Sequence, residues 1–203
     1  MTEAIQKIFA LEGLSVTHTE VEKDFIHVYG QLTEEKQSIC PECGCNHTIF
    51  KDRKTRAFHL PPIGSRCGIL KLQLRRNQCV NCKHAWWPQL PFAEGKQRMT
   101  HAFIDHVLDL LKMGTISDVA NHLGVSWDTV KDIHKTYLQE RYKDLDLSNI
   151  EYLSIDEFAI RKGHTYMTIV SDCASGRIVH AVEGRKAKDI APFLEKLKKS
   201  LRI

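Results

Sequence analysis

The residues with the clearest chemistry in this sequence are two Cys-x-x-Cys pairs, Cys40 with Cys43 and Cys79 with Cys82. Two thiolates at this spacing can chelate one metal ion from a tight turn. Gly44, directly after the first pair, permits the positive φ that such a turn often requires. Two pairs together supply the four soft ligands of a tetrahedral structural zinc site. We therefore predict that these four cysteines bind one Zn²⁺ ion, which stabilises the fold and takes no part in catalysis.

Four other residues near the two pairs also carry metal-binding groups: Cys45, His47, Cys67 and His84. Cys45 is the strongest substitute among them, although four ligands already complete a zinc site. Lys83 stands where the second turn would place its glycine. The alternatives to zinc are unligated thiols or a redox pair, and the presence of two pairs makes both of them weaker interpretations.

A second group of candidate functional residues lies in a predicted three-helix segment. Apolar residues at helical spacing predict helices near residues 100–112, 116–123 and 126–137, with Gly114 ending the first helix. Their inward stripes are Phe103, Ile104, Val107, Leu108 and Leu111, then Ile116, Val119, Ala120 and Leu123, then Val130, Ile133 and Tyr137. Gly124 supplies a sharp turn before the third helix, and Ser126 is a suitable N-cap for it. This order is typical of a helix-turn-helix, and a plain helical bundle is the alternative.

In a helix-turn-helix, the amino-terminal residues of the last helix face the base edges of the major groove. Ser126, Trp127 and Thr129 occupy these positions here, while Lys131 and Lys135 follow at positions suited to phosphate contacts. The sequence does not indicate which bases these residues would prefer.

A third candidate is Asp156, which lies on a predicted strand over residues 152–158. Two more strands are predicted over 166–171 and 177–182, and an amphipathic helix with Phe193, Leu194 and Leu197 inward ends the sequence. Strand, strand, strand, helix is the order in which a ribonuclease H-like α/β domain begins. Three further acids have weaker claims to a catalytic role: Glu157 points to the opposite side of the strand, Asp172 lies in a turn, and Asp189 caps or begins the helix.

These elements predict an α+β multi-domain chain. We expect an amino-terminal β-hairpin region over 1–39, a zinc ribbon over 40–95, a helix-turn-helix three-helix unit over 100–142, and the first part of a ribonuclease H-like domain over 151–203. Within the ribbon, Leu70, Leu72 and Leu74 alternate with polar residues and predict a strand that leads into the second cysteine pair.

Charge and hydropathy indicate the partners and the compartment. The 203 residues carry a formal net charge of +4, but residues 40–100 alone have 11 basic and 3 acidic side chains. This basic block favours a polyanionic partner, and an ordinary solvated face is the alternative. No run of 18 apolar residues and no signal peptide are present, so we expect a cytoplasmic, nucleoid-associated protein with no membrane contact.

The order of these motifs resembles the bacterial insertion-sequence transposases of the ISL-three family. The similarity rests on residues 40–44, the helix-turn-helix of 116–133, residues 154–159 followed by Lys162-Gly163-His164-Thr165-Tyr166, the turn from Asp172 to Arg177, and Gly184-Arg185. The resemblance implies a DDE transposase, in which three acids hold two Mg²⁺ or Mn²⁺ ions for DNA strand cleavage and transfer. Asp156 matches the first of these acids.

The family's second aspartate and final glutamate lie on later elements, which this sequence lacks. We therefore expect a transposase fragment that binds double-stranded DNA at the element's terminal inverted repeats and does not cleave it alone. Arg75, Arg76, Lys131 and Lys135 are its expected phosphate contacts, and another copy or an intact transposase is its expected protein partner. The alternatives are a zinc-dependent DNA-binding transcriptional regulator or repressor of transposition, and a nuclease-like domain completed by another chain.

Overall fold

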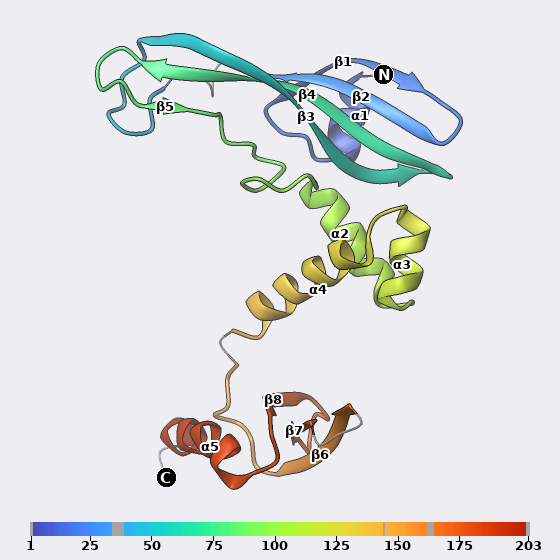
Figure 1. The fold of residues 1–203 in the computed structure, drawn as a ribbon, viewed down its shortest axis with the longest axis vertical. Coiled ribbons are helices and arrows are strands. Elements are labelled where there is room, and N and C mark those ends of the chain that lie inside the picture. Colours follow the sequence, from blue (N-terminus) through green and yellow to red (C-terminus); the bar gives the residue numbers. More distant parts are fainter. Residues whose placement is uncertain (1, 34–38, 144, 162–164, 202–203) are drawn as a thin grey trace. The chain divides into compact units, whose positions relative to one another are not determined.

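The computed structural model describes residues 2–33, 39–143, 145–161 and 165–201, and it divides into two compact units (Figure 1). The first unit comprises residues 1–137 and the second unit residues 138–203. The Lys162-Gly163-His164 part of the family motif lies outside the described residues. None of the described helices is long and apolar enough to span a membrane.

The first unit is built on a five-stranded sheet that follows a short helix, α1 (Thr2–Ile8). The strands are β1 (Leu14–Val21), β2 (Phe25–Leu32), β3 (Thr48–Ile63), β4 (Arg66–Cys79) and β5 (Ala85–Trp86). Their order is β1-β2-β4-β3, and β5 pairs with the cysteine end of β4. β1 with β2 and β3 with β4 form antiparallel hairpins, while β2 runs parallel to β4. The amino-terminal hairpin and the long β3–β4 hairpin therefore belong to one sheet.

The core of this sheet contains the three leucines whose spacing predicts a strand. Leu70, Leu72 and Leu74 are buried on β4 because alternate residues of a strand face the same side. They pack with Leu14 and Val28 of the amino-terminal hairpin. The turn after α1 contributes Phe9 to the cluster, and the segment after β5 contributes Phe92 and Ala93.

Three helices complete the first unit, and hydrogen bonds at their ends determine where they begin and stop. The helices are α2 (His101–Leu110), α3 (Ile116–Leu123) and α4 (Trp127–Arg141). The Thr115 side chain accepts from the backbone N–H of Asp118, whose carboxylate accepts from the N–H of Thr115, so α3 begins in a capping box. Gly124 ends α3 in the left-handed conformation with φ of 64°. The expectation that Gly114 ends α2 is wrong, because α2 stops at Leu110 with Leu111 as a right-handed C-cap.

The helical core contains most of the residues of the predicted stripes. Its buried residues are Phe103, Val107, Val119, Ala120, Leu123, Val130 and Ile133. Ile104, Leu108, Leu111 and Ile116 are partly buried against this core. Tyr137 is also only half-buried and lies beside Leu108 and Leu111 at the edge of the α2–α4 packing. The Ser126 hydroxyl accepts from the backbone N–H of Thr129 at 3.1 Å and thereby caps α4 as expected.

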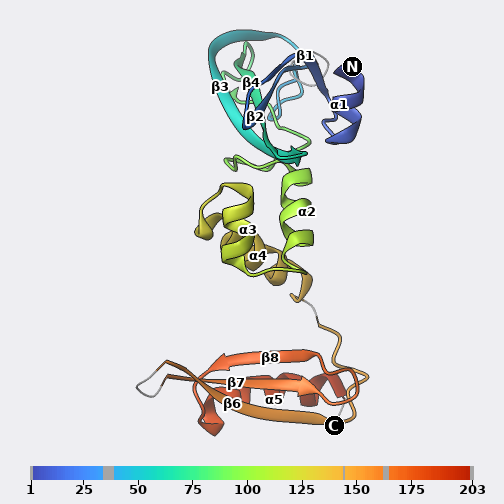
Figure 2. The ribbon, with the colours of Figure 1, turned by 90° about the vertical axis from the view of Figure 1, so that its right-hand side faces the viewer.

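The second unit is an antiparallel sheet with one helix on a single face (Figure 2). Its strands β6 (Leu153–Arg161), β7 (Thr165–Asp172) and β8 (Ile178–Glu183) lie in that order, and α5 (Ala187–Leu201) follows. Val170, Ile190, Phe193 and Leu197 form most of the core between sheet and helix. The elements have the predicted order, and their assignment to a ribonuclease H-like fold stays a prediction.

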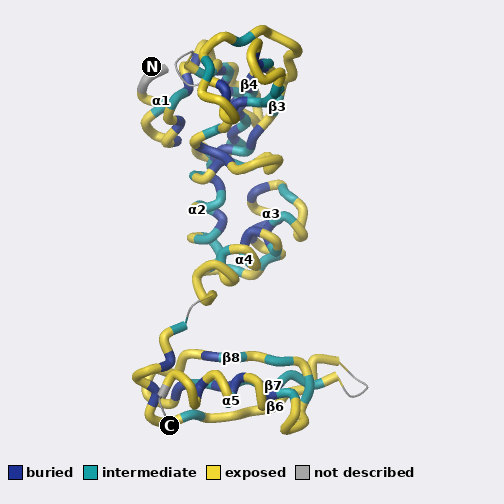
Figure 3. Tube along the Cα trace, turned by 90° about the vertical axis from the view of Figure 1, so that its left-hand side faces the viewer, coloured by how far each residue is buried: buried dark blue, intermediate teal, exposed yellow. Residues whose placement is uncertain are grey.

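β6 is much more exposed than the other two strands of the second unit (Figure 3). Every residue from Ser154 to Arg161 is exposed, including Ile155, Phe158 and Ile160. β7 is the strand that pairs with β6, so one edge of β6 carries backbone groups without a strand partner in the described chain. β6 thus presents both an open edge and apolar side chains to its surroundings.

Candidate metal centre and nucleic-acid interface

The four predicted zinc ligands meet at the open end of the β3–β4 hairpin, where Thr48 pairs with Cys79. The Sγ atoms of Cys40, Cys43, Cys79 and Cys82 all lie within 4.8 Å of one another. Cys40 Sγ is 3.6 Å from Cys82 Sγ, and Cys43 Sγ is 3.6 Å from Cys79 Sγ. A tetrahedral zinc ion with Zn–S bonds of about 2.3 Å separates its sulfurs by about 3.8 Å. The spacing of the four sulfurs therefore suits a single Zn²⁺ ion.

The two cysteine pairs lie on turns with the same backbone geometry. The N–H of Gly44 donates to the carbonyl of Cys40 at 3.0 Å, and the N–H of Lys83 donates to the carbonyl of Cys79 at 3.2 Å. Gly44 has φ of 69° and Lys83 has φ of 62°, so both turns use the left-handed conformation at the same position. Lys83 therefore adopts the conformation that glycine would have more readily.

The backbone at the second turn also favours a thiolate. The N–H groups of Cys82 and Asn81 point at Cys79 Sγ and lower the pKa of the Cys79 thiol to about 6. At Cys82 the backbone N–H of His84 favours the thiolate, but burial and the neighbouring sulfurs outweigh it and raise the pKa to about 12. The backbone thus favours the thiolate form of Cys79, which is the form that binds zinc. A divalent ion between the four sulfurs would also favour the thiolate of Cys82.

The other sulfur and imidazole candidates lie outside this cluster. Cys45 Sγ accepts from the backbone N–H of His47, and Cys67 Sγ contacts the carbonyl of Leu123 at 3.9 Å. His84 stacks on Trp86 and lies 3.9 Å from a carboxylate oxygen of Glu42. Among the described residues, the metal-ligand cluster contains only the four cysteines of the Cys-x-x-Cys pairs.

The predicted DNA-contacting residues lie along α4, from its N-cap Ser126 to Lys135 past the middle of the helix, but not all of them are free. The Ser126 and Thr129 hydroxyls lie 2.8 Å apart, and Ser126 also caps the helix. Lys131 Nζ lies 2.7 Å from Asp128 Oδ1 and above the Trp127 ring. Trp127 is 47% exposed and Lys135 is exposed, so these two side chains are the most available for DNA.

The two predicted arginines of the ribbon are both exposed, but they face opposite sides of β4 because they are adjacent on a strand. Arg75 lies opposite Arg53 of β3, and Arg76 lies opposite Asp52. The basic residues of β3 belong to the basic block of residues 40–100, but none of them was predicted as a DNA contact, although their concentration over residues 51–56 was a usable signal. Of these, Arg56 is held in the structure, since its guanidinium donates to the carbonyls of Gly95 and Gln97.

Asp156 lies at the middle of β6 and is exposed. It is paired across the strands with Ile169, whereas Glu157 is paired with the buried Thr168. Because cross-strand partners share a face, the two acids point to opposite faces, as their adjacency on a strand requires. Within the described chain Asp156 belongs to no group of three metal-binding side chains.

Asp172 has a structural role at the end of β7. It is buried, and its carboxylate accepts from the backbone N–H groups of Ala174 and Ser175 and from the Ser175 hydroxyl. These donors, the Ser175 hydroxyl first, hold the pKa of Asp172 below its usual value. The carboxylate oxygens are therefore occupied by the turn that joins β7 to β8.

This arrangement predicts that the second unit loses stability in acid. A carboxyl group whose pKa is lower in the folded than in the unfolded state stabilises the fold above its unfolded pKa, about 3.9 for aspartate. That contribution disappears as the pH falls from about 4 through the folded value. The urea midpoint, followed by NMR signals of β7 at about pH 6 and about pH 3, should fall less in Asp172→Asn than in the unsubstituted chain. Equal losses in both proteins would contradict this role of Asp172.

Comparison with known proteins relates both units to one family. Residues 88–138 match the helix-turn-helix domain of transposase family ISL3. Residues 153–203 match the DDE domain of the same family, which is described as a transposase. The chain belongs to the ISL3 transposase family. The first match runs from the segment after β5 into α4, and the second covers β6 to α5. The regulator alternative is not favoured by these matches.

Curated relatives of this ISL3 chain are transposases. The chain is 30% identical over 162 residues to the transposase for insertion sequence element IS1001 of Bordetella parapertussis, a match covering 80% of the chain and 40% of the relative. It is 29% identical over 109 residues to the transposase for insertion sequence element IS1557 of two Mycobacterium tuberculosis strains, covering 53% of the chain and 24% of each relative. The ISL3 chain thus spans two fifths or less of these relatives. No solved structure shows a significant match to the chain.

Proposed function

We propose that this ISL3-family chain binds double-stranded DNA at the ends of its insertion element, with α4 as the recognition helix. The observation that carries the proposal is the helix-turn-helix geometry of α3 and α4 within the segment that matches the family's helix-turn-helix domain. Gly124 makes the sharp turn between the two helices, and Val130 and Ile133 of α4 pack inward. The opposite side of α4 is left exposed and can enter a major groove.

Trp127 and Lys135 are the side chains on which this contact depends most. Trp127 lies in the first turn of α4, where an apolar ring can contact a thymine methyl group in the groove. Lys135 lies two turns further along the helix, where it can reach a phosphate. Lys131 can join it after exchanging Asp128 for a phosphate, whereas Ser126 serves mainly as the helix cap.

The cysteine cluster would hold a structural Zn²⁺ ion at the open end of the β3–β4 hairpin. Four thiolates at tetrahedral spacing close the coordination shell, so such an ion contributes folding free energy and leaves no position open for a substrate. Its effect on DNA binding is indirect: it would keep the end of the β3–β4 hairpin ordered.

Asp156 is proposed as the first carboxylate of a DDE centre. Its carboxylate is exposed on β6 and accessible to Mg²⁺ or Mn²⁺, with Oδ1 also accepting from the backbone N–H of Glu157. In a complete centre such an ion would activate the attacking oxygen for DNA strand cleavage and transfer. A second copy of the chain or an intact transposase is the proposed protein partner. Binding to chromosomal DNA would place the protein at the nucleoid.

Binding measurements with the zinc-loaded chain test the proposal. We expect a duplex carrying the terminal inverted repeat of the element to bind at least about a hundredfold more tightly than a scrambled duplex at about 150 mM salt. A nuclease footprint should lie on the repeat itself. Equal affinity for both duplexes would contradict recognition of element ends, and footprints at unrelated promoters would instead indicate a regulator.

A further inference from the structure

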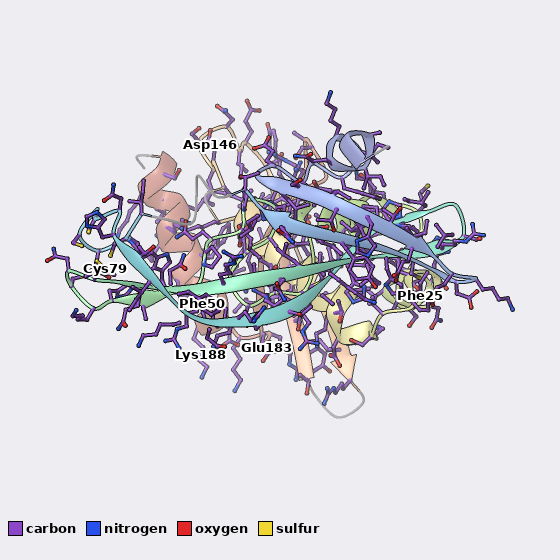
Figure 4. The ribbon with its side chains drawn as sticks, turned by 90° about the horizontal axis from the view of Figure 1, so that it is seen from above. Phe25, Phe50, Cys79, Asp146, Glu183 and Lys188 are labelled. Atoms are coloured by element: carbon purple, nitrogen blue, oxygen red, sulfur yellow. The ribbon has the colours of Figure 1, made fainter. Side chains whose placement is uncertain are left out.

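One face of the β3–β4 hairpin carries an exposed hollow that the helix-turn-helix does not use. Phe50 and Arg53 of β3 and Gln73 and Arg75 of β4 line it. This half of the hairpin extends beyond the sheet core, since residues 49–55 of β3 are all exposed. Figure 4 labels Phe50 on β3 and Cys79 near the end of the same hairpin. The hollow is therefore an accessible surface on a hairpin whose end the cysteine cluster holds.

Two arginines face each other across this hollow without a carboxylate between them. Arg53 and Arg75 are direct cross-strand partners, a position at which like charges destabilise a sheet. Neither forms an ion pair within the described parts of the chain. The neighbouring carboxylate of Asp52 accepts from the backbone N–H of Arg53 at 2.7 Å. An anion placed between the two guanidinium groups would relieve their repulsion.

The aromatic ring beside these arginines is also unpacked. Phe50 is 55% exposed, although it lies on the same hairpin as the buried Phe58 and Leu74. An exposed ring next to cationic side chains is the combination that binds single nucleic-acid strands, where arginines contact phosphates and the ring stacks on a base. Gln73 adds an amide that can donate to and accept from a strand.

We propose that this hollow binds a DNA strand with an unpaired base, its phosphates between Arg53 and Arg75 and the base stacked on Phe50. The proposal rests on the proposed function in that the polyanion is DNA, but it assigns a site separate from α4. The hollow would not discriminate between base sequences, because phosphates are common to all sequences and every base has a face that can stack. The site would therefore respond to a frayed or single-stranded DNA end.

The test uses the full-length, zinc-loaded chain and two fluorescent DNA probes of scrambled sequence. One probe is a blunt duplex, and the other is the same duplex with a single-stranded extension. The variants are Arg53→Ala/Arg75→Ala and Phe50→Ala, and the matched control is Lys7→Ala/Lys23→Ala, which removes two exposed charges from the same unit. Fluorescence anisotropy over a range of salt concentrations gives the affinities and their salt slopes.

The arginine variant should bind the extended probe about tenfold more weakly at about 100 mM salt, with a salt slope smaller by about two. Phe50→Ala should weaken binding to the extended probe about tenfold and leave the blunt duplex within about twofold of the unsubstituted chain. The control variant should change neither probe by more than about twofold. An arginine variant that behaves like the control would overturn the site, and an equal effect of Phe50→Ala on both probes would overturn base stacking.

The outcome is separable from that of the proposed function. The arginine variant should weaken terminal-repeat and scrambled duplexes by the same factor, so that the preference for the repeat is retained. A chain without any preference for the repeat that still loses affinity in the arginine variant would reject the proposed function and support the hollow. A chain that prefers the repeat, and whose arginine variant binds DNA as tightly as the unsubstituted chain, would support the proposed function and reject the hollow as a binding site.

Discussion

Serine in place of Cys79 is expected to abolish zinc binding and to disorder the end of the β3–β4 hairpin. Cys79 is fully buried in the cluster, and the backbone stabilises its thiolate. A serine hydroxyl stays protonated at neutral pH and is a poor ligand for zinc. Structural zinc sites contribute about 10–16 kcal/mol of apparent binding free energy, a quantity comparable to the whole stability of a domain. Losing one of four ligands should therefore be severe.

The damage should be concentrated at the end of the hairpin. The buried leucines of the sheet lie nearer the turn of the hairpin, whereas residues 49–55 are all exposed and have no buried core to keep them in place. We expect the zinc content to fall from about one ion per chain to nearly none. Limited proteolysis should then cut within residues 40–55 before it cuts β1 or β2.

Cys45→Ser is the matched control, because Cys45 lies beside the cluster but outside it. That variant should keep its zinc and its resistance to protease. A Cys79→Ser protein that retains a full equivalent of zinc would contradict the assignment. So would a chelator that releases no metal and leaves the circular dichroism spectrum unchanged.

Changing the two lysines of α4 is expected to produce the largest loss of DNA affinity. Lys135→Glu reverses an exposed charge that we place at a phosphate. Lys131→Gln removes a second charge without adding another acid beside Asp128 and Asp132. Because each phosphate contact releases counterions, the double variant should bind the terminal repeat on the order of a hundredfold more weakly at about 100 mM salt.

The fold should survive this double change, since the buried residues Val130 and Ile133 lie on the other side of α4. A control with the same change in net charge is Lys188→Gln/Lys199→Glu in α5, which should bind the repeat within about threefold of the unsubstituted chain. Thermal melts of both proteins should coincide with that of the parent. Equal losses of affinity in the two variants would show that net charge, and not α4, governs binding.

Local patterns in the sequence predicted local structure well. The alternation of Leu70, Leu72 and Leu74 predicted β4 and the side that it buries, because the side-chain period of a strand is two. Gly124 and Ser126 predicted the end of α3 and the cap of α4, because both act through hydrogen bonds within a few residues. The residue type and spacing of the four cysteines predicted that they lie together in one cluster.

The parts that were missed depend on pairing between distant segments. Nothing local indicates that β2 runs parallel to β4, since that contact joins Phe25 to Cys67. The opposition of Arg53 and Arg75 depends on the register between β3 and β4, which includes a bulge between Phe50 and Asp52. β3 itself lacks a clear alternation because its first half is exposed on both faces. The hollow of Phe50, Arg53, Gln73 and Arg75 was therefore not predictable from the sequence.

The parallel contact between β2 and β4 also implies an order of assembly for the sheet. β1–β2 and β3–β4 are hairpins, and their innermost pairs, Val21 with Ile26 and Ile63 with Arg66, close after only a few residues. Joining the hairpins pairs residues about forty positions apart in the sequence, which costs more chain entropy than closing either turn, so we expect it to follow the local steps. Docking brings Leu14 and Val28 onto Leu70 and Leu72, so burial of the core coincides with this late step. We therefore expect the sheet of the first unit to form as two rapid hairpins, whose slower association completes its hydrophobic core.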